Sequence, residues 1–259
     1  MTTAVRRARI PAVIPAAIAA AWLLAVLAQA SGRGRALHHD ALLEGGPPLW
    51  VALGLFIVAW QAMVAAMMLP TVIPLLRNYL VVSVSQPRQR TLIAAFLGGY
   101  ALIWTIFGVA GFLGDDALHH TVDRTPWLSA RPWLISGGVL ALAGAFQFSD
   151  LKDRCLRKCR LPGLYLAHHY RSGVAGAFRL GRGHGLFCVG CCWALMLVMF
   201  AAGVANLWWM AALTAVMVYE KTGHSGDRAV PVVGVVLLSW AVLVLAHPAW
   251  LPTAFAGVD

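Results

Sequence analysis

Between Leu49 and Leu69 the chain reads LWVALGLFIVAWQAMVAAMML, a stretch without a single charged residue. A transmembrane α-helix needs about 20 consecutive apolar residues to cross the hydrocarbon core of a bilayer. The stretch has this length and composition, so it predicts a membrane-spanning helix.

Similar apolar runs, separated by polar stretches, occupy most of the chain. Of its 259 residues, 60% are hydrophobic and 12% are charged, whereas about 45–50% and about 25% are usual in a soluble domain. We therefore predict an all-α fold, a polytopic bundle of membrane helices that forms a single integral membrane domain over residues 1–259. Besides the first stretch, the runs cover about 11–30, 92–113, 133–148, 185–219 and 230–246.

Two of these runs allow a second interpretation. The run 185–219 is too long for one span, and Asn206, followed by two tryptophans, suits a tight turn at a membrane interface. We interpret it as two helices, 184–205 and 207–219, which makes seven spans in all; a single tilted helix would make six. The first run follows basic residues, as in a signal peptide, but its length favours an uncleaved anchor.

The basic residues are distributed unevenly between the two sides of this seven-span arrangement. Sixteen of the 20 lysines and arginines lie on the side of the N-terminus and four on the other side. Because basic residues accumulate in cytoplasmic loops, we expect a cytoplasmic N-terminus and a basic cytoplasmic connection over residues 149–183. The expected location is the bacterial cytoplasmic (inner) membrane, with the lipid bilayer as a partner. The net charge of +10 follows from this distribution and does not indicate nucleic-acid binding.

All five cysteines lie on or near the expected cytoplasmic face. Cys155 and Cys159 are four residues apart, so on a helix they would share a face. The remaining three lie in the stretch GHGLFCVGCCWALM, from Gly183 to Met196, where Cys188 and Cys192 have the same spacing. In a reducing compartment these cysteines are expected to be free thiols.

Thiolates prefer soft metal ions such as copper(I) or zinc, or an iron–sulfur cluster. His184 lies four residues before Cys188 and adds an imidazole to the same helix face. We favour copper and keep zinc as an alternative. Free cysteine also packs as a small apolar residue, and the CxxC spacing of Cys188 and Cys191 also allows thiol–disulfide chemistry. The predicted metal ligands are Cys155, Cys159, His184, Cys188, Cys191 and Cys192.

Two methionines could supplement this set. Met67 and Met68 precede Pro70 and Pro74, which we expect to loosen the cytoplasmic end of the second span. Thioether sulfur suits copper(I), so we predict Met67 and Met68 as auxiliary ligands, with packing as the alternative.

Other polar residues receive simpler interpretations. Glu220 and Lys221 end the sixth span and read as an ion pair or as snorkelling side chains at the interface. The expected outer face carries the pairs His38–His39 and His119–His120 beside aspartates, which could bind copper(II) or zinc but also suit solvated loops.

Five stretches of the chain form a recognisable set of motifs: AMMLP, FLGGYALIWTIFG, CLRKCRLP, HHYRSGVAGAFRLGRGHGLFCVGCCWALM and GVANLWWMAALTAVMVYEK. Together they resemble a bacterial family of predicted metal-binding integral membrane proteins of unknown function. The resemblance covers about Trp60 to Lys221 and implies a multi-helix membrane fold with a metal-related role. The family's Cys/His motifs fall on the six ligands named above, and further family positions fall on Met67, Met68, Asn206, Glu220 and Lys221.

The chain contains no P-loop, nucleophile elbow or HExxH motif, so an enzyme is the less favoured class. We expect a membrane protein that binds copper through its cytoplasmic-side Cys/His cluster. It would deliver the metal to a membrane metalloenzyme, assist the maturation of such an enzyme, or transfer the metal. The alternatives are a non-catalytic accessory subunit of a larger membrane enzyme complex and a membrane thiol oxidoreductase.

Overall fold

The structure, a computed structural model, describes residues 10–31, 48–202 and 206–247. Within these ranges all elements of regular structure are α-helices, as the sequence predicts. In chain order they are α2 (Val13–Ala30), α4 (Leu49–Val82), α5 (Gln89–Asp123), α6 (Pro126–Ser129), α7 (Pro132–Phe146), α8 (Asp150–Arg160), α9 (Pro162–His169), α10 (Gly173–Ala202), α11 (Leu207–Thr222) and α12 (Gly226–Ala246).

Five of the described helices are long and apolar enough to cross a membrane: α2, α4, α5, α10 and α12. A sixth span results if α7 and α8, which meet at an angle of 64°, are counted as one broken helix. The remaining predicted span corresponds to α11, which has only 16 residues. The number of seven spans and the cytoplasmic N-terminus stay predictions.

Helix α4 does not end at its prolines, and this corrects the expectation of an irregular helix end. Pro70 and Pro74 lie inside a continuous helix of 34 residues. Proline lacks the N–H that would bond the carbonyl four residues earlier, which is Ala66 for Pro70. The indole nitrogen of Trp22 in α2 donates to that carbonyl at 3.2 Å. A neighbouring helix thus satisfies the freed backbone group, which is how membrane helices tolerate proline.

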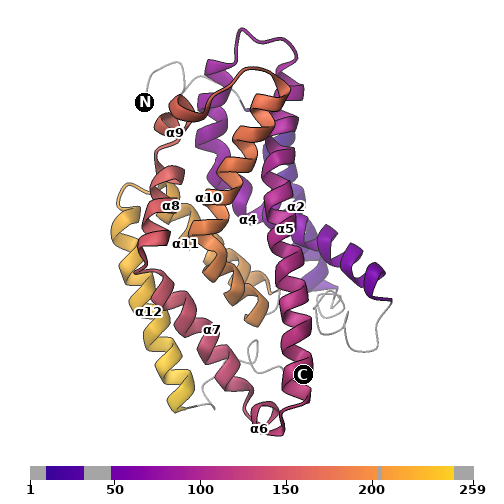
Figure 1. Cartoon of the computed structure of the whole chain (residues 1–259), viewed down its shortest axis with the longest axis vertical. Helices are drawn as coiled ribbons and strands as arrows, with labels where there is room; N and C mark the ends of the chain where they lie inside the picture. Colours follow the sequence, from indigo (N-terminus) through magenta and orange to yellow (C-terminus); the bar gives the residue numbers. More distant parts are fainter. Residues whose placement is uncertain (1–9, 32–47, 203–205, 248–259) are drawn as a thin grey trace.

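Helices α5 and α10 run side by side at very short distance (Figure 1). A Cβ atom at Gly99 of α5 would collide with the backbone of Phe178, and one at Gly181 of α10 would collide with the backbone of Phe96. Small residues allow helix backbones to approach in this way. The contact fixes the position of α10, the helix that carries three of the cysteines.

The basic connection 149–183 is helical throughout most of its length, which the sequence analysis did not anticipate. It contains α8, α9 and the first residues of α10, which begins at Gly173 rather than near His184. Five glycines and two arginines lie among residues 173–185 and mask the apolar signal. Buried residues such as Ala177 and Leu180 nevertheless pack this part of α10 into the bundle.

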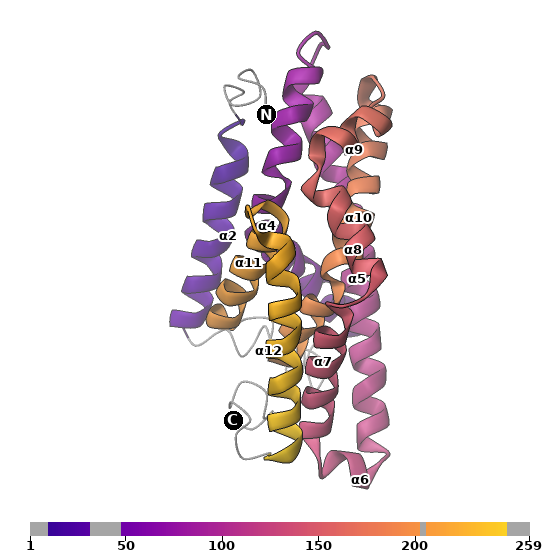
Figure 2. The ribbon, with the colours of Figure 1, turned by 90° about the vertical axis from the view of Figure 1, so that its left-hand side faces the viewer.

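The break at Asn206 is confirmed. Its side chain caps α11 by accepting a hydrogen bond from the backbone N–H of Trp209 at 3.3 Å, the usual role of asparagine at a helix start. Beyond α11, helix α12 lies beside α7 (Figure 2).

The histidines expected on the outer face are only partly described. His119 and His120 each lie within 4 Å of the aspartate four residues earlier on α5, Asp115 and Asp116. His38 and His39 fall outside the described residues.

Candidate metal centre

Helix α8 presents two cysteines to the bundle because its sequence is amphipathic. Its buried residues are Lys152, Cys155, Leu156 and Cys159, spaced at helical intervals, while the intervening charged residues are exposed. Ser149 caps the helix by accepting from the N–H of Lys152. The shared face predicted for Cys155 and Cys159 is thus confirmed, and it faces α10.

A buried ion pair holds α8 against α11. The ammonium of Lys152 lies 2.7 Å from a carboxylate oxygen of Glu220, and both side chains are almost fully buried. At the end of α8, Arg160 donates to the carbonyl of Glu220 at 2.6 Å and to that of Gly223 at 3.3 Å. Arg160 therefore binds the last carbonyls of α11, where a cation also complements the helix dipole.

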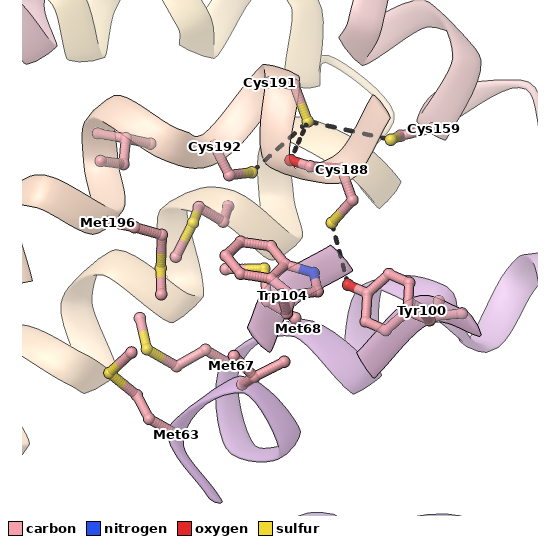
Figure 3. Close-up of a cluster of buried hydrophobic side chains, with 14 of the residues drawn as sticks. Met63, Met67, Met68, Tyr100, Trp104, Cys159, Cys188, Cys191, Cys192 and Met196 are labelled. Carbon is pink, nitrogen blue, oxygen red and sulfur yellow. Dashed lines mark hydrogen bonds between the residues drawn. The ribbon is translucent and has the colours of Figure 1, made fainter. Parts of the chain in front are cut away.

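The structure brings three of the predicted ligands together. The sulfur of Cys159 on α8 lies 3.9 Å from that of Cys191 on α10, and the Cys191 sulfur lies 3.5 Å from that of Cys192. Figure 3 shows these sulfurs directed toward one another. All three thiols are buried and none forms a disulfide. Two sulfurs at such separations can both lie about 2.3 Å from one metal ion, the usual zinc–thiolate bond length.

Cys188 has different neighbours, although it belongs to the same stretch. Its sulfur lies 3.0 Å from the hydroxyl of Tyr100 and 2.9 Å from the ammonium of Lys221. The Cys191 thiol in turn donates to the backbone carbonyl of Cys188 at 3.2 Å. Cys188 is therefore adjacent to the sulfur group, which consists of Cys159, Cys191 and Cys192. Its own sulfur instead contacts the phenol of Tyr100 and the ammonium of Lys221.

Lys221 lies at the candidate centre, a position that the sequence analysis did not predict. The interpretation of Glu220 and Lys221 as an interfacial pair or snorkelling residues is wrong, because both are buried and Glu220 binds Lys152 instead. The Lys221 ammonium also lies 3.4 Å from the hydroxyl of Thr71 and 3.9 Å from the sulfur of Met68. Consecutive residues on a helix do not face each other, so helix geometry alone argues against the pair.

The two predicted methionines are buried within α4, not at a loosened end. Met68 reaches the site through Lys221, whereas Met67 is completely buried. Figure 3 shows Met63, Met67 and Met196 gathered to one side of the cysteine sulfurs. These three methionines thus place apolar, sulfur-containing side chains on one side of the cysteines. That Met67 is a metal ligand stays a prediction.

His184 and Cys155 lie beside the centre. The His184 ring is buried between aromatic rings, with its centroid 6.0 Å from that of Tyr100 and 5.6 Å from that of Tyr165, and its Nδ1 has no hydrogen-bond partner among the described residues. Cys155 packs against Gly190, where an added Cβ would lie 2.7 Å from its sulfur. The sulfur contacts among the described residues join Cys159, Cys191 and Cys192 and include neither Cys155 nor His184. We therefore leave both residues out of the candidate centre, and their assignment as ligands stays a prediction.

Tyr165 on α9 closes this side of the site. Burial, with a smaller contribution from the nearby Cys159, raises the pKa of its hydroxyl well above the usual value of 10.0. The phenol therefore stays protonated, and its O–H donates a hydrogen bond to the backbone carbonyl of Leu180 at 3.2 Å. This bond ties α9 to α10 beside Cys159.

The described part of the chain contains no group of three or more His, Cys, Asp and Glu side chains that together could hold a metal ion. A structural zinc site has four such ligands in tetrahedral arrangement. The pairs Cys159–Cys191 and Cys191–Cys192 each offer two cysteine sulfurs. Such a small number of soft ligands suits copper(I).

Comparison with known proteins gives one match. A family model described as PpoB2, copper chaperone, matches residues 57–244, a range that includes all five cysteines. No curated protein and no solved structure matches the chain.

Proposed function

Because the chain belongs to the PpoB2 copper chaperone family, we propose that it holds copper(I) in the membrane with two thiolates, that of Cys191 and that of either Cys159 or Cys192. It then passes the ion to a membrane metalloenzyme. The observation that supports this proposal most directly is the meeting of Cys159 from α8 with Cys191 from α10, sulfur to sulfur at 3.9 Å. The two residues are 32 positions apart in the sequence, and simple packing does not require their sulfurs to meet.

The charge of the site favours copper(I) over zinc. Two thiolates and one copper(I) ion carry a net charge of −1, and the buried ammonium of Lys221 next to Cys188 balances it. With a divalent ion the same groups would keep a positive charge, which is costly away from water. Cu(I) is therefore the ion that leaves this buried centre neutral.

Burial also suits a carrier of copper(I). Cys188, Cys191 and Cys192 are at most 1% exposed, so bound copper would be shielded from water and oxidants. The flanking helix α8 is short; its buried face packs on α10, and Lys152 and Arg160 attach it to α11. Movement of α8 would separate Cys159 from Cys191 and open the centre for release.

The alternative of a thiol oxidoreductase using Cys188 and Cys191 receives less support. The Cys188 sulfur contacts Tyr100 and Lys221, whereas the Cys191 sulfur contacts Cys159 and Cys192. The two proposed redox partners thus face different groups.

Copper binding by the purified full-length protein tests the proposal. We expect the wild type to retain copper(I) against a chelator and to show copper–sulfur scattering by X-ray absorption. Because Cys191 contacts both other sulfurs, Cys191→Ser should weaken copper retention by at least about a hundredfold. Cys155→Ser is the matched control and should behave as wild type. Wild-type protein that holds no copper, or a Cys191→Ser variant that holds it as tightly, would contradict the proposal.

A further inference from the structure

A cavity of about 860 Å³ lies between α4, α8, α9 and α11, and it reaches the sulfur group. Its walls include Asn78, Arg160, Gly163 and Tyr170, and Cys159 and Lys221 are part of the lining. Small-molecule sites have volumes of about 300–1,000 Å³. The cavity therefore has the size for a small ligand rather than for a protein domain.

Cys159 connects this cavity with the buried centre. Among the described residues that line the cavity it is the only cysteine, and its sulfur lies 3.9 Å from that of Cys191. Cys191 and Cys192 are both buried and do not line the cavity. Copper that enters through this cavity would therefore meet Cys159 first.

The charges of the cavity favour an anion. Arg160 and Lys221 are the charged residues of the lining, and none of the described residues that line the cavity is acidic. The carboxylate nearest to Arg160, that of Asp227 at 3.7 Å, is 71% exposed and lies outside the lining. A cleft lined by one sign of charge raises the local concentration of ligands of the opposite sign. A free copper cation would be repelled, whereas copper(I) held by two small thiolates is an anion.

We propose that this cavity is the loading site, where a low-molecular-weight copper(I)–thiolate complex docks and Cys159 is the first acceptor of the ion. This inference rests on the proposed copper-binding function and adds the form in which copper arrives. It also assigns to Cys159 a role that differs from those of Cys191 and Cys192.

The transfer is a ligand exchange without redox chemistry. The Cys159 sulfur forms a bond to copper, one bond between copper and a donor thiolate breaks, and the Cys159 proton leaves with that thiolate as a free thiol. The same exchange at Cys191 releases the second donor thiol with the proton of Cys191. Copper remains copper(I) throughout.

The rate of copper loading tests this inference in the purified full-length protein. The donor is the copper(I) complex of glutathione, which is anionic, and the comparison donor is the copper(I)–acetonitrile cation. Gly163→Phe would place a phenyl ring in the cavity and keep every cysteine, since a Cβ at Gly163 meets only the Asn78 side-chain nitrogen at 3.7 Å. Cys155→Ser is the control, because Cys155 shares α8 with Cys159 but does not line the cavity.

We expect Gly163→Phe and Cys159→Ser to slow loading from the glutathione complex on the order of tenfold. Gly163→Phe should reach the same final copper content as wild type, and Cys155→Ser should load at the wild-type rate. Loading from the acetonitrile cation should be affected less by Gly163→Phe. Wild-type loading rates in both variants, or a bound phospholipid that Gly163→Phe expels without slowing loading, would overturn the inference. Wild-type protein that takes up no copper from either donor would instead refute the proposed function.

Discussion

Two lysines are buried in this protein, and their surroundings differ. Lys152 on α8 is paired with the carboxylate of Glu220 at 2.7 Å, whereas Lys221 on α11 lies against the sulfur of Cys188 at 2.9 Å. A buried ammonium is costly unless it is paired and hydrogen-bonded. Lys152 has a fixed internal partner and attaches one helix to another. Lys221 has a sulfur partner within the candidate centre, so its charge would be available to the proposed metal–thiolate group.

The two buried ammonium groups thus have different kinds of partner, a carboxylate for Lys152 and a sulfur for Lys221. The Lys152–Glu220 pair joins α8 to α11, and Cys159 on the same helix α8 lies 3.9 Å from Cys191. The ammonium of Lys221 places a positive charge beside the sulfur of Cys188. Substitutions at the two positions should therefore affect different measurements.

The largest effect on stability is expected from Glu220→Leu. It removes the partner of Lys152 and leaves a buried, uncompensated ammonium, which costs about 3–5 kcal/mol. Unfolding of the full-length protein in detergent, followed by intrinsic fluorescence, would measure the loss. The double variant Lys152→Met/Glu220→Leu is the control and should recover most of the stability, since an apolar pair replaces the ion pair. If the single and double variants were equally unstable, the pair would not be what holds α8 in place.

A smaller and different effect is expected from Lys221→Met. Loss of the positive charge beside Cys188 should weaken copper(I) binding by roughly 10–100-fold, the range seen for residues that support metal ligands. Stability should change little, because an apolar side chain replaces a charge that has no carboxylate partner in the described contacts. Chelator competition measures the affinity, and unfolding of the same sample measures stability. A variant that lost stability but kept copper affinity would assign Lys221 the same structural role as Lys152.

The smallest effect is expected at the surface end of α8. Arg160 lies 3.7 Å from the carboxylate of Asp227, which is 71% exposed. Exposed ion pairs contribute about 0–1 kcal/mol, so Asp227→Asn should leave both unfolding and copper retention within experimental error of wild type. A large loss in either measurement would mean that α8 depends on this pair as well as on Lys152.

Sequence reasoning found the helices but misplaced several of their ends. Hydropathy located α2 and α12 well because lipid and protein interior impose the same apolar composition. It ended α5 near residue 113, ten residues before its end at Asp123, because aspartates and histidines follow the apolar run. It failed at Pro70, where the carbonyl left without its usual donor is satisfied by Trp22 from another helix. It failed again at Gly173, because arginines and glycines weaken the apolar signal of a helix whose inner face is nevertheless packed.

The candidate ligands were found from residue type and spacing, but their grouping was not. The four-residue spacing of Cys155 and Cys159 predicts a common face, yet only Cys159 meets another sulfur in the described contacts. The spacing of His184 and Cys188 also predicts a common face, yet the His184 ring packs among aromatic rings. The direction of a side chain depends on the neighbouring helix, which spacing within one helix does not reveal.

By itself, the amino-acid sequence determined the all-α class, the apolar segments and the clustering of every thiol within residues 155–192, because hydropathy and residue chemistry are local properties. The tertiary structure alone decided that Cys159 meets Cys191, that Glu220 binds Lys152, and that Lys221 reaches Cys188. These contacts join α8, α10 and α11. Their physical cause is the close packing of those helices, which leaves each buried charge or thiol only the partners that the neighbouring helix supplies.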